Sequence, residues 1–143
     1  MKAMDKLFLD ANILFTAAYS ESGGSRALFE LAKIGKIILV SSNYAISEAR
    51  HNIEKKLTEK HLVNLYKLLS ELKSVDKKNF SYQEIQKYAK IIIAKDIPIL
   101  LASENQKVQI LITLDKKDFK TPSIKAANLP FEIMSPGEYL QSL

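Results

Sequence analysis

The stretch that decides the fold is Lys6-Leu7-Phe8-Leu9-Asp10-Ala11-Asn12-Ile13-Leu14-Phe15. Its apolar run at 7–9 is too short for a helix and has the length of a buried strand. After Asp10 the apolar residues return at helical spacing, at Ile13 and Leu14. The stretch therefore predicts a strand that ends in a carboxylate and passes directly into a helix. Ligands bind at this end of the strands in an open parallel sheet. Asp is also a favoured helix N-cap, so Asp10 taken alone fits both roles.

The rest of the chain alternates between predicted strands and helices. Further strands are expected at 36–40, 109–114 and 131–134. Helices are expected from a cap at Ser25 to Gly35, at 41–57, 58–72, 81–93 and 98–105, and after 135. The segment 74–80 is too polar to assign. This alternation predicts an α/β fold of three layers, α/β/α, with a central, mostly parallel sheet covered on both faces.

Length and composition bound the class of protein. We expect 143 residues to form one domain, 1–143, with a substantial core. No apolar run approaches the roughly 20 residues that a membrane-spanning helix needs, and the N-terminus lacks the pattern of a secretory signal. The absence of cysteine excludes disulfides and thiolate metal sites, and two histidines make a zinc site improbable. A cytoplasmic protein with no membrane partner is expected.

The charge balance favours a polyanionic partner. Lys and Arg outnumber Asp and Glu by 21 to 16, which gives a net charge of +5. Such an excess modestly favours nucleic acid, although many basic proteins bind none. Only Arg26 and Arg50 are arginines, so lysines supply most of the positive field. Lys95, beside Asp96, and Arg50 are candidate phosphate contacts, although solvated surface charges are the more common role.

Acidic residues from distant parts of the chain are predicted to meet at one edge of the sheet. Asp10 and Asp115 both follow predicted strands, so both belong at the carboxyl edge. Asp96 opens the helix before the strand at 109–114, and a crossover helix begins at that same edge. Glu48 lies about one and a half turns into the helix after the second strand, within reach of the edge. Asp118, one turn beyond Asp115, is a fifth candidate.

Such a cluster points to a metal. Carboxylates that converge repel one another unless a cation lies between them. Oxygen ligands without Cys or His suit Mg²⁺ or Mn²⁺, and a metal ion there would polarise a phosphoryl oxygen and activate a water molecule. Asn12 and Thr113 are placed to orient a carboxylate by hydrogen bonds. Each acid also has an ordinary role: Asp96 as a cap, Glu48 as a solvated side chain, and 115–118 as a turn.

Four blocks of sequence carry these acids: Leu9-Asp10-x-Asn12, Ser47-Glu48, Asp96-x-Pro98-Ile99-Leu100-x-Ala102 and Leu111-Ile112-Thr113-Leu114-Asp115-x-x-Asp118-Phe119. In this order, and over essentially the whole chain, they resemble the PIN domain family. The resemblance implies an α/β/α fold and a metal-dependent ribonuclease, in many members the toxin of a toxin–antitoxin pair. It departs from the family pattern at Glu104, where a small or apolar residue is commoner.

The resemblance also implies roles for individual residues. It assigns catalysis and binding of Mg²⁺ or Mn²⁺ to Asp10, Glu48, Asp96 and Asp115. Asp118 matches a further position that is acidic in some members and is a candidate ligand. Asn12 and Thr113 match supporting positions, and no RNA-binding residue is indicated. RNA is the implied substrate, and an antitoxin protein and a second copy of the chain are candidate partners.

Three other functions share part of this sequence pattern. An aspartyl-phosphate phosphatase needs a second acid two residues after its nucleophile, where this chain has Asn12. A structure-specific DNA nuclease of related fold would carry more acids and long insertions. A PIN-like module that binds RNA or protein without cutting it is the main competitor, although degenerate members typically lose acids that this chain retains.

Overall fold

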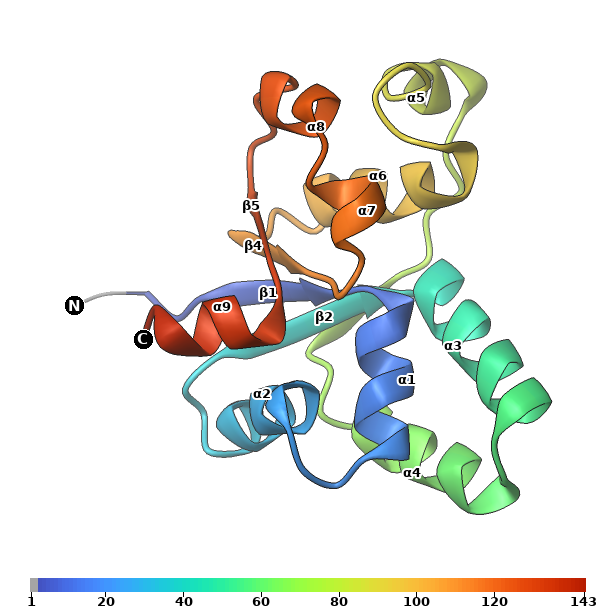
Figure 1. Ribbon diagram of the computed structural model, residues 1–143, viewed down its shortest axis with the longest axis vertical. Coiled ribbons are helices and arrows are strands. Elements are labelled where there is room, and N and C mark those ends of the chain that lie inside the picture. Colours follow the sequence, from blue (N-terminus) through green and yellow to red (C-terminus); the bar gives the residue numbers. More distant parts are fainter. Residues whose placement is uncertain (1–2) are drawn as a thin grey trace.

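A five-stranded sheet forms the centre of the protein in the computed structural model, which describes residues 3–143 (Figure 1). The strands lie in the order β3-β2-β1-β4-β5. Their bounds are β1 Lys6–Leu9, β2 Ile38–Ser42, β3 Ser74–Asp76, β4 Ile110–Ile112 and β5 Glu132–Met134. All four pairings are parallel, with Phe8 of the central strand opposite Val40 on one side and Leu111 on the other. The predicted mostly parallel sheet is confirmed.

Helices cover both faces of this sheet. They are α1 Ala11–Tyr19, α2 Gly24–Lys33, α3 Asn43–Lys56, α4 Glu59–Leu69, α5 Tyr82–Gln86, the 3₁₀ turn η1 Ala94–Asp96, α6 Ile97–Asn105, α7 Lys116–Phe119, α8 Pro122–Ala126 and α9 Pro136–Gln141. Figure 1 shows α1, α2 and α4 on one side of the sheet and α6, α7 and α8 on the other, and α3 packs against both α1 and α4. The arrangement is the predicted three-layer α/β/α fold. Among residues 3–143, no helix is both long and apolar enough to cross a membrane.

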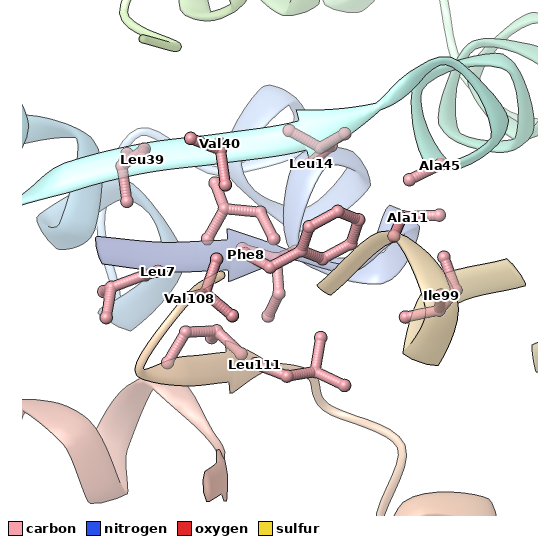
Figure 2. Packing of buried hydrophobic residues seen from close by; sticks show 14 of the residues in the cluster. Leu7, Phe8, Ala11, Leu14, Leu39, Val40, Ala45, Ile99, Val108 and Leu111 are labelled. Carbon is pink, nitrogen blue, oxygen red and sulfur yellow. The ribbon is translucent and has the colours of Figure 1, made fainter. Parts of the chain in front are cut away.

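The core explains why the opening stretch decides the fold. Leu7, Phe8 and Leu9 of β1 have no exposed surface. A strand at the middle of a sheet covered on both faces has no solvent side, so its sequence reads as a continuous apolar run. Figure 2 shows this strand among its neighbours, with Leu14 of α1 and Ile99 of α6 drawn from the two helical layers.

Local signals set most of the helix boundaries. The Ser42 hydroxyl caps α3 by accepting from the Ala45 N–H at 3.1 Å. Ser81 and Glu84 form the predicted capping box at the start of α5. Gly35 follows α2 with φ of 77°, a left-handed conformation that favours glycine. These boundaries depend on short-range chemistry, which is why the sequence predicts them.

Two helix predictions were wrong at their ends. The helix predicted from a cap at Ser25 has Gly23 as its N-cap, so Ser25 lies inside α2 and is buried. The helix predicted to reach residue 93 ends at Gln86. Beyond it the chain continues in tighter turns, with Tyr88 N–H donating to the Ile85 carbonyl at 3.2 Å. Such turns keep a near-helical spacing of apolar residues, which explains why the pattern extended too far.

The short elements escaped prediction for a different reason. β3 lies in the segment 74–80, and as an edge strand it pairs only with β2 and keeps its side chains half-buried. The predicted strand 36–40 is observed two residues later, and the strand predicted at 109–114 is observed at 110–112. α8 begins at Pro122 after a Thr121 cap, so the sequence does carry a start signal. The helix is too short for apolar residues to recur at helical spacing after that signal. Three to five residues are too few for periodicity to register.

Candidate active site

A cavity of about 220 Å³ opens at the carboxyl edge of the sheet. It is lined by residues from α1, α3, η1 and the segment after β4: Asp10, Ala11, Asn12, Phe15, Thr16, Glu48, Asn52, Lys56, Lys95, Asp96 and Asp115. The four acids predicted as catalytic all line it. The parallel topology accounts for this meeting, because β1 and β4 end at this edge while α3 and α6 begin there.

Asp10 is at once a helix cap and a buried member of this site. Its Oδ1 accepts from the Ala11 N–H at 2.7 Å, the bond of an N-cap. Its Oδ2 accepts from the Thr113 hydroxyl at 2.8 Å and the Asn12 amide at 3.3 Å. Burial raises the pKa of Asp10 to about 6, although its hydrogen bonds with Thr113 and Ala11 oppose the rise. The negative charges of Asp96 and Glu48 raise it further.

Asn12 and Thr113 join α1 to the segment after β4. The Asn12 amide donates to the Thr113 hydroxyl oxygen at 3.2 Å, and its Oδ1 accepts from the Leu114 N–H at 3.0 Å. The Thr113 oxygen also accepts from the Asp115 N–H at 3.1 Å. One hydroxyl thus contacts both Asp10 and the backbone of Asp115, so the two predicted supporting residues fix the relative positions of two acids.

Asp96, Asp115 and Asp118 form the most compact acidic group. One carboxylate oxygen from each lies within 4.8 Å of the other two. The Asp118 N–H donates to Asp115 Oδ1 at 3.0 Å, so the single turn of α7 brings the fifth candidate beside the fourth. Asp96 and Asp115 line the cavity together with Asp10 and Glu48, whereas Asp118 is not part of its lining. Asp10 and Glu48 are outside the compact group.

Lys95 contacts this acidic group directly. Its Nζ lies 3.1 Å from both carboxylate oxygens of Asp96 and 3.6 Å from Asp118 Oδ2. Burial raises the pKa of Asp96, Lys95 opposes that rise, and Asp118 adds to it. Burial alone would lower the pKa of Lys95, but the hydrogen bond to Asp96 and the charge of Asp118 outweigh it and raise that pKa. The acids therefore already attract a cation, which is the property that a metal site requires.

The α3 side of the cavity carries a polar stripe that the sequence analysis missed in part. Glu48 is exposed, and Asn52 and Lys56 line the cavity with it. The three follow one another at intervals of four residues, so they share one face of the helix. That spacing was the signal available in the sequence. Arg50 lies off this face and pairs with Glu54 at 3.8 Å, so it does not line the cavity.

The donor set fits the predicted ion. The acidic side chains of the cavity offer carboxylate oxygens, which are the hard ligands that Mg²⁺ and Mn²⁺ prefer. Two of these acids, Asp96 and Asp115, lie close to Asp118, and such close spacing would be costly without a neighbouring positive charge. The Lys95 ammonium supplies part of that charge. The residues present therefore suit a divalent cation.

Comparison with known proteins gives fold relatives. No family model matches the sequence, and no curated protein does. Among solved structures, VapBC2 from Rickettsia felis, bound to a DNA fragment from its promoter, is similar at a TM-score of 0.63 and 21% identity, over 90% of this chain and 98% of that one. FitAcB from Neisseria gonorrhoeae is similar at a TM-score of 0.61 and 17% identity, over 92% and 98%.

A third solved structure extends the likeness. VapC20 from Mycobacterium tuberculosis, a Sarcin-Ricin loop cleaving toxin, is similar at a TM-score of 0.57 and 11% identity, over 86% of this chain and 95% of that one. Sequence identities this low are evidence for a shared fold alone, but the alignments cover nearly the whole length of both chains in each comparison. Together with the parallel five-stranded sheet and its two helical layers, they show that this chain has the PIN-domain fold.

Proposed function

We propose that the protein is a PIN-family endoribonuclease that hydrolyses RNA phosphodiester bonds with the help of Mg²⁺ or Mn²⁺. The observation that carries the proposal is the meeting of Asp10, Glu48, Asp96 and Asp115 around one cavity, from four separate segments of the chain. A buried carboxylate with a raised pKa is unfavourable for folding, and such groups cluster at functional sites. The structural likeness to an RNA-cleaving toxin supports the same chemistry.

The ion would be held by Asp96, Asp115 and Asp118, with Asp10 and Glu48 of the cavity lining as further ligands. When bound, it supplies Lewis-acid chemistry: it polarises a phosphoryl oxygen and lowers the pKa of a water molecule.

The chain's own residues bind and orient the substrate. Thr113 and Asn12 hold the Asp10 carboxylate in one orientation through their hydrogen bonds to Oδ2. Lys56 and Lys95 line the cavity and carry positive charge to the place where a phosphate would enter. The Asn52 amide, which also lines the cavity, can donate to a phosphate oxygen.

The proposal includes partners and a place of action. Many PIN domains are toxins of toxin–antitoxin pairs, and this chain is structurally similar to the toxin VapC20, so we propose the role of a toxin with an antitoxin protein as its partner. A second copy of the chain is a further proposed partner. The expected place of action is the cytoplasm, where the RNA substrate is found.

Cleavage of defined RNAs tests the activity. We expect the wild-type protein to cut RNA with Mg²⁺ or Mn²⁺ and to lose this activity in EDTA. The Asp96→Asn variant should be inactive with either ion, because it loses an anionic ligand, while its far-UV circular dichroism stays unchanged. The matched control is Glu21→Gln, which removes an exposed acid from the loop between α1 and α2 and should cut normally.

Two outcomes would contradict the proposal. Undiminished cleavage by Asp96→Asn, purified free of other nucleases, would remove the acidic site from the reaction. A wild-type protein that binds RNA but cuts none with either ion would instead be the non-catalytic binding module.

A further inference from the structure

A second cavity of about 380 Å³ adjoins the acidic one. It is lined by the first turns of α3, the segment after β3, and α6. Tyr44, in its lining, is one helical turn before Glu48 on α3. Pro98, also in its lining, is two residues beyond Asp96. Helix α3 therefore contributes to the walls of both cavities, and η1 of the acidic cavity leads directly into α6 of the second one.

Tyr44 presents an aromatic surface at this boundary. Its side chain is 41% exposed, and its hydroxyl donates to the Lys95 carbonyl at 2.6 Å. The hydrogen bond fixes the ring next to the residue that contacts the acidic group. Phe80 contributes a second, half-buried ring to the lining. Aromatic surfaces of this kind are where unpaired bases stack on RNA-binding proteins.

The polar groups of the cavity also suit a nucleotide. Lys77 is exposed, and none of the ion pairs found within residues 3–143 involves it. The neighbouring Asp76 carboxylate is already engaged, since it accepts from the Asn105 amide at 3.1 Å and the Lys78 N–H at 2.9 Å. An exposed positive charge in the lining of a cavity with aromatic walls is complementary to a base and its phosphate.

We propose that this second cavity binds an unpaired nucleobase of the RNA substrate, with the base against Tyr44 and its flanking phosphate at Lys77. The proposal rests on the proposed ribonuclease function and adds a subsite to it. A cavity of about 380 Å³ falls within the range of small-ligand sites, roughly 300–1,000 Å³. Bases within an A-form duplex are stacked and paired, so the subsite selects single-stranded RNA.

Binding measured in EDTA separates this subsite from catalysis. We expect Tyr44→Ala to lower the affinity for a fluorescent single-stranded oligonucleotide by about fivefold to a hundredfold, the range for loss of one stacking contact. Its weak affinity for a duplex of the same sequence should not change. Tyr44→Phe keeps the ring but loses the hydrogen bond that positions it, so its affinity should lie between those of the wild type and Tyr44→Ala. Tyr66→Ala is the matched control, because Tyr66 is a 51% exposed tyrosine on α4, a helix that contributes no residue to the lining of either cavity.

The lysine provides a second test that does not depend on an aromatic side chain. Lys77→Ala should reduce the slope of log affinity against log salt by about 0.7, as loss of one contact to a single-stranded phosphate requires. Lys60→Ala, which removes an exposed lysine from α4, should leave the slope unchanged.

The outcomes distinguish this proposal from the proposed function. If the wild type cuts and binds RNA while Tyr44→Ala and Lys77→Ala bind single strands as well as their controls do, the subsite is wrong and the ribonuclease stands; the cavity would then suit a peptide of a partner protein. If both variants weaken duplex and single strand equally, base recognition is wrong. A wild-type protein that neither binds nor cuts RNA would overturn both proposals.

Discussion

At the scale of single residues, Asp10 shows why an acid at the end of a strand is hard to interpret from sequence. The cap and the cluster looked like alternatives, but the carboxylate has two oxygens and uses one for each. Oδ1 caps α1 through Ala11, and Oδ2 contacts Thr113 and Asn12 on the cavity side. A carboxylate that served only as a helix cap could do so at the surface of the protein. Burial near other acids adds a free-energy penalty that capping does not explain, and the proposed cation-binding site would account for it.

The raised pKa of Asp10 predicts a specific dependence of stability on pH. Its pKa is about 6 in the folded protein and 3.8 for an ordinary Asp. Between these values the folded state keeps a proton that the unfolded chain has released, so the free energy of unfolding decreases as pH rises through this window. The total loss is about 3 kcal/mol at 1.36 kcal/mol per pKa unit. Asp10→Asn cannot ionise and should not show this loss.

Urea unfolding of both proteins in EDTA, at several pH values between 3.8 and 6 and at neutral pH, checks this expectation. Asp96 titrates in both proteins, so its contribution largely cancels in the difference between them. At neutral pH, Mn²⁺ at about 100 times its dissociation constant should restore about 2.7 kcal/mol to the wild type and much less to the variant. If the free energies of unfolding of the wild type and Asp10→Asn depended on pH in the same way, and Mn²⁺ changed neither, Asp10 would be only a helix cap.

At the scale of elements, the sequence predicted the meeting of four acids at one cavity better than it predicted the helix and strand boundaries. Apolar runs and parallel topology were enough to bring the acids to one edge, because that edge is set by strand direction rather than by exact length. The tighter turns after Gln86 and the edge strand β3 depend on hydrogen bonds formed in the folded protein. The same holds for Lys95, whose contact with Asp96 and Asp118 depends on the bend of η1 into α6 and not on spacing.

Ser42 and Ser25 were both candidate helix N-caps in the sequence, but only Ser42 is a cap in the structure. Ser42 caps α3, the helix that carries Glu48, through its bond from the Ala45 N–H. Ser42→Ala should lower the free energy of unfolding by about 1 kcal/mol, the usual loss for an N-cap. Ser25, which the sequence also suggested as a cap, lies inside α2, where alanine is the better helix former. Ser25→Ala should therefore cause no loss.

Urea denaturation with both variants and the wild type measures the two changes under one condition. Equal losses for Ser42→Ala and Ser25→Ala would contradict the observed start of α2 at Gly24. A neutral Ser42→Ala would mean that the hydrogen bond to Ala45 contributes nothing to holding α3 in place.

At the scale of the whole molecule, a basic chain surrounds an acidic site. The net charge is +5, while the cavity itself gathers four carboxylates beside two lysines. The acids repel a phosphate, so the lysines and the proposed cation would have to outweigh them before the proposed RNA substrate could approach. Because 19 of the 21 basic residues are lysines, the attraction is that of point charges and carries little sequence information. Base recognition has to come from another part of the surface, which is the role proposed for the cavity beside Tyr44.

This charge distribution predicts a steep dependence of RNA binding on salt. If Lys56 and Lys95 of the acidic cavity and Lys77 of its neighbour each contact a phosphate, log affinity should fall with log salt at a slope of about −2, at 0.7 per contact for a single strand. Mn²⁺ should also raise the affinity for RNA, and by less in the Asp96→Asn variant than in the Glu48→Gln variant. Asp96 belongs to the compact acidic group and Glu48 does not, so Asp96→Asn should lose more of the metal binding. Fluorescence anisotropy over a series of salt concentrations gives both quantities. An affinity that stays flat from low to moderate salt would exclude a path for the RNA backbone along these lysines, whatever the acids do.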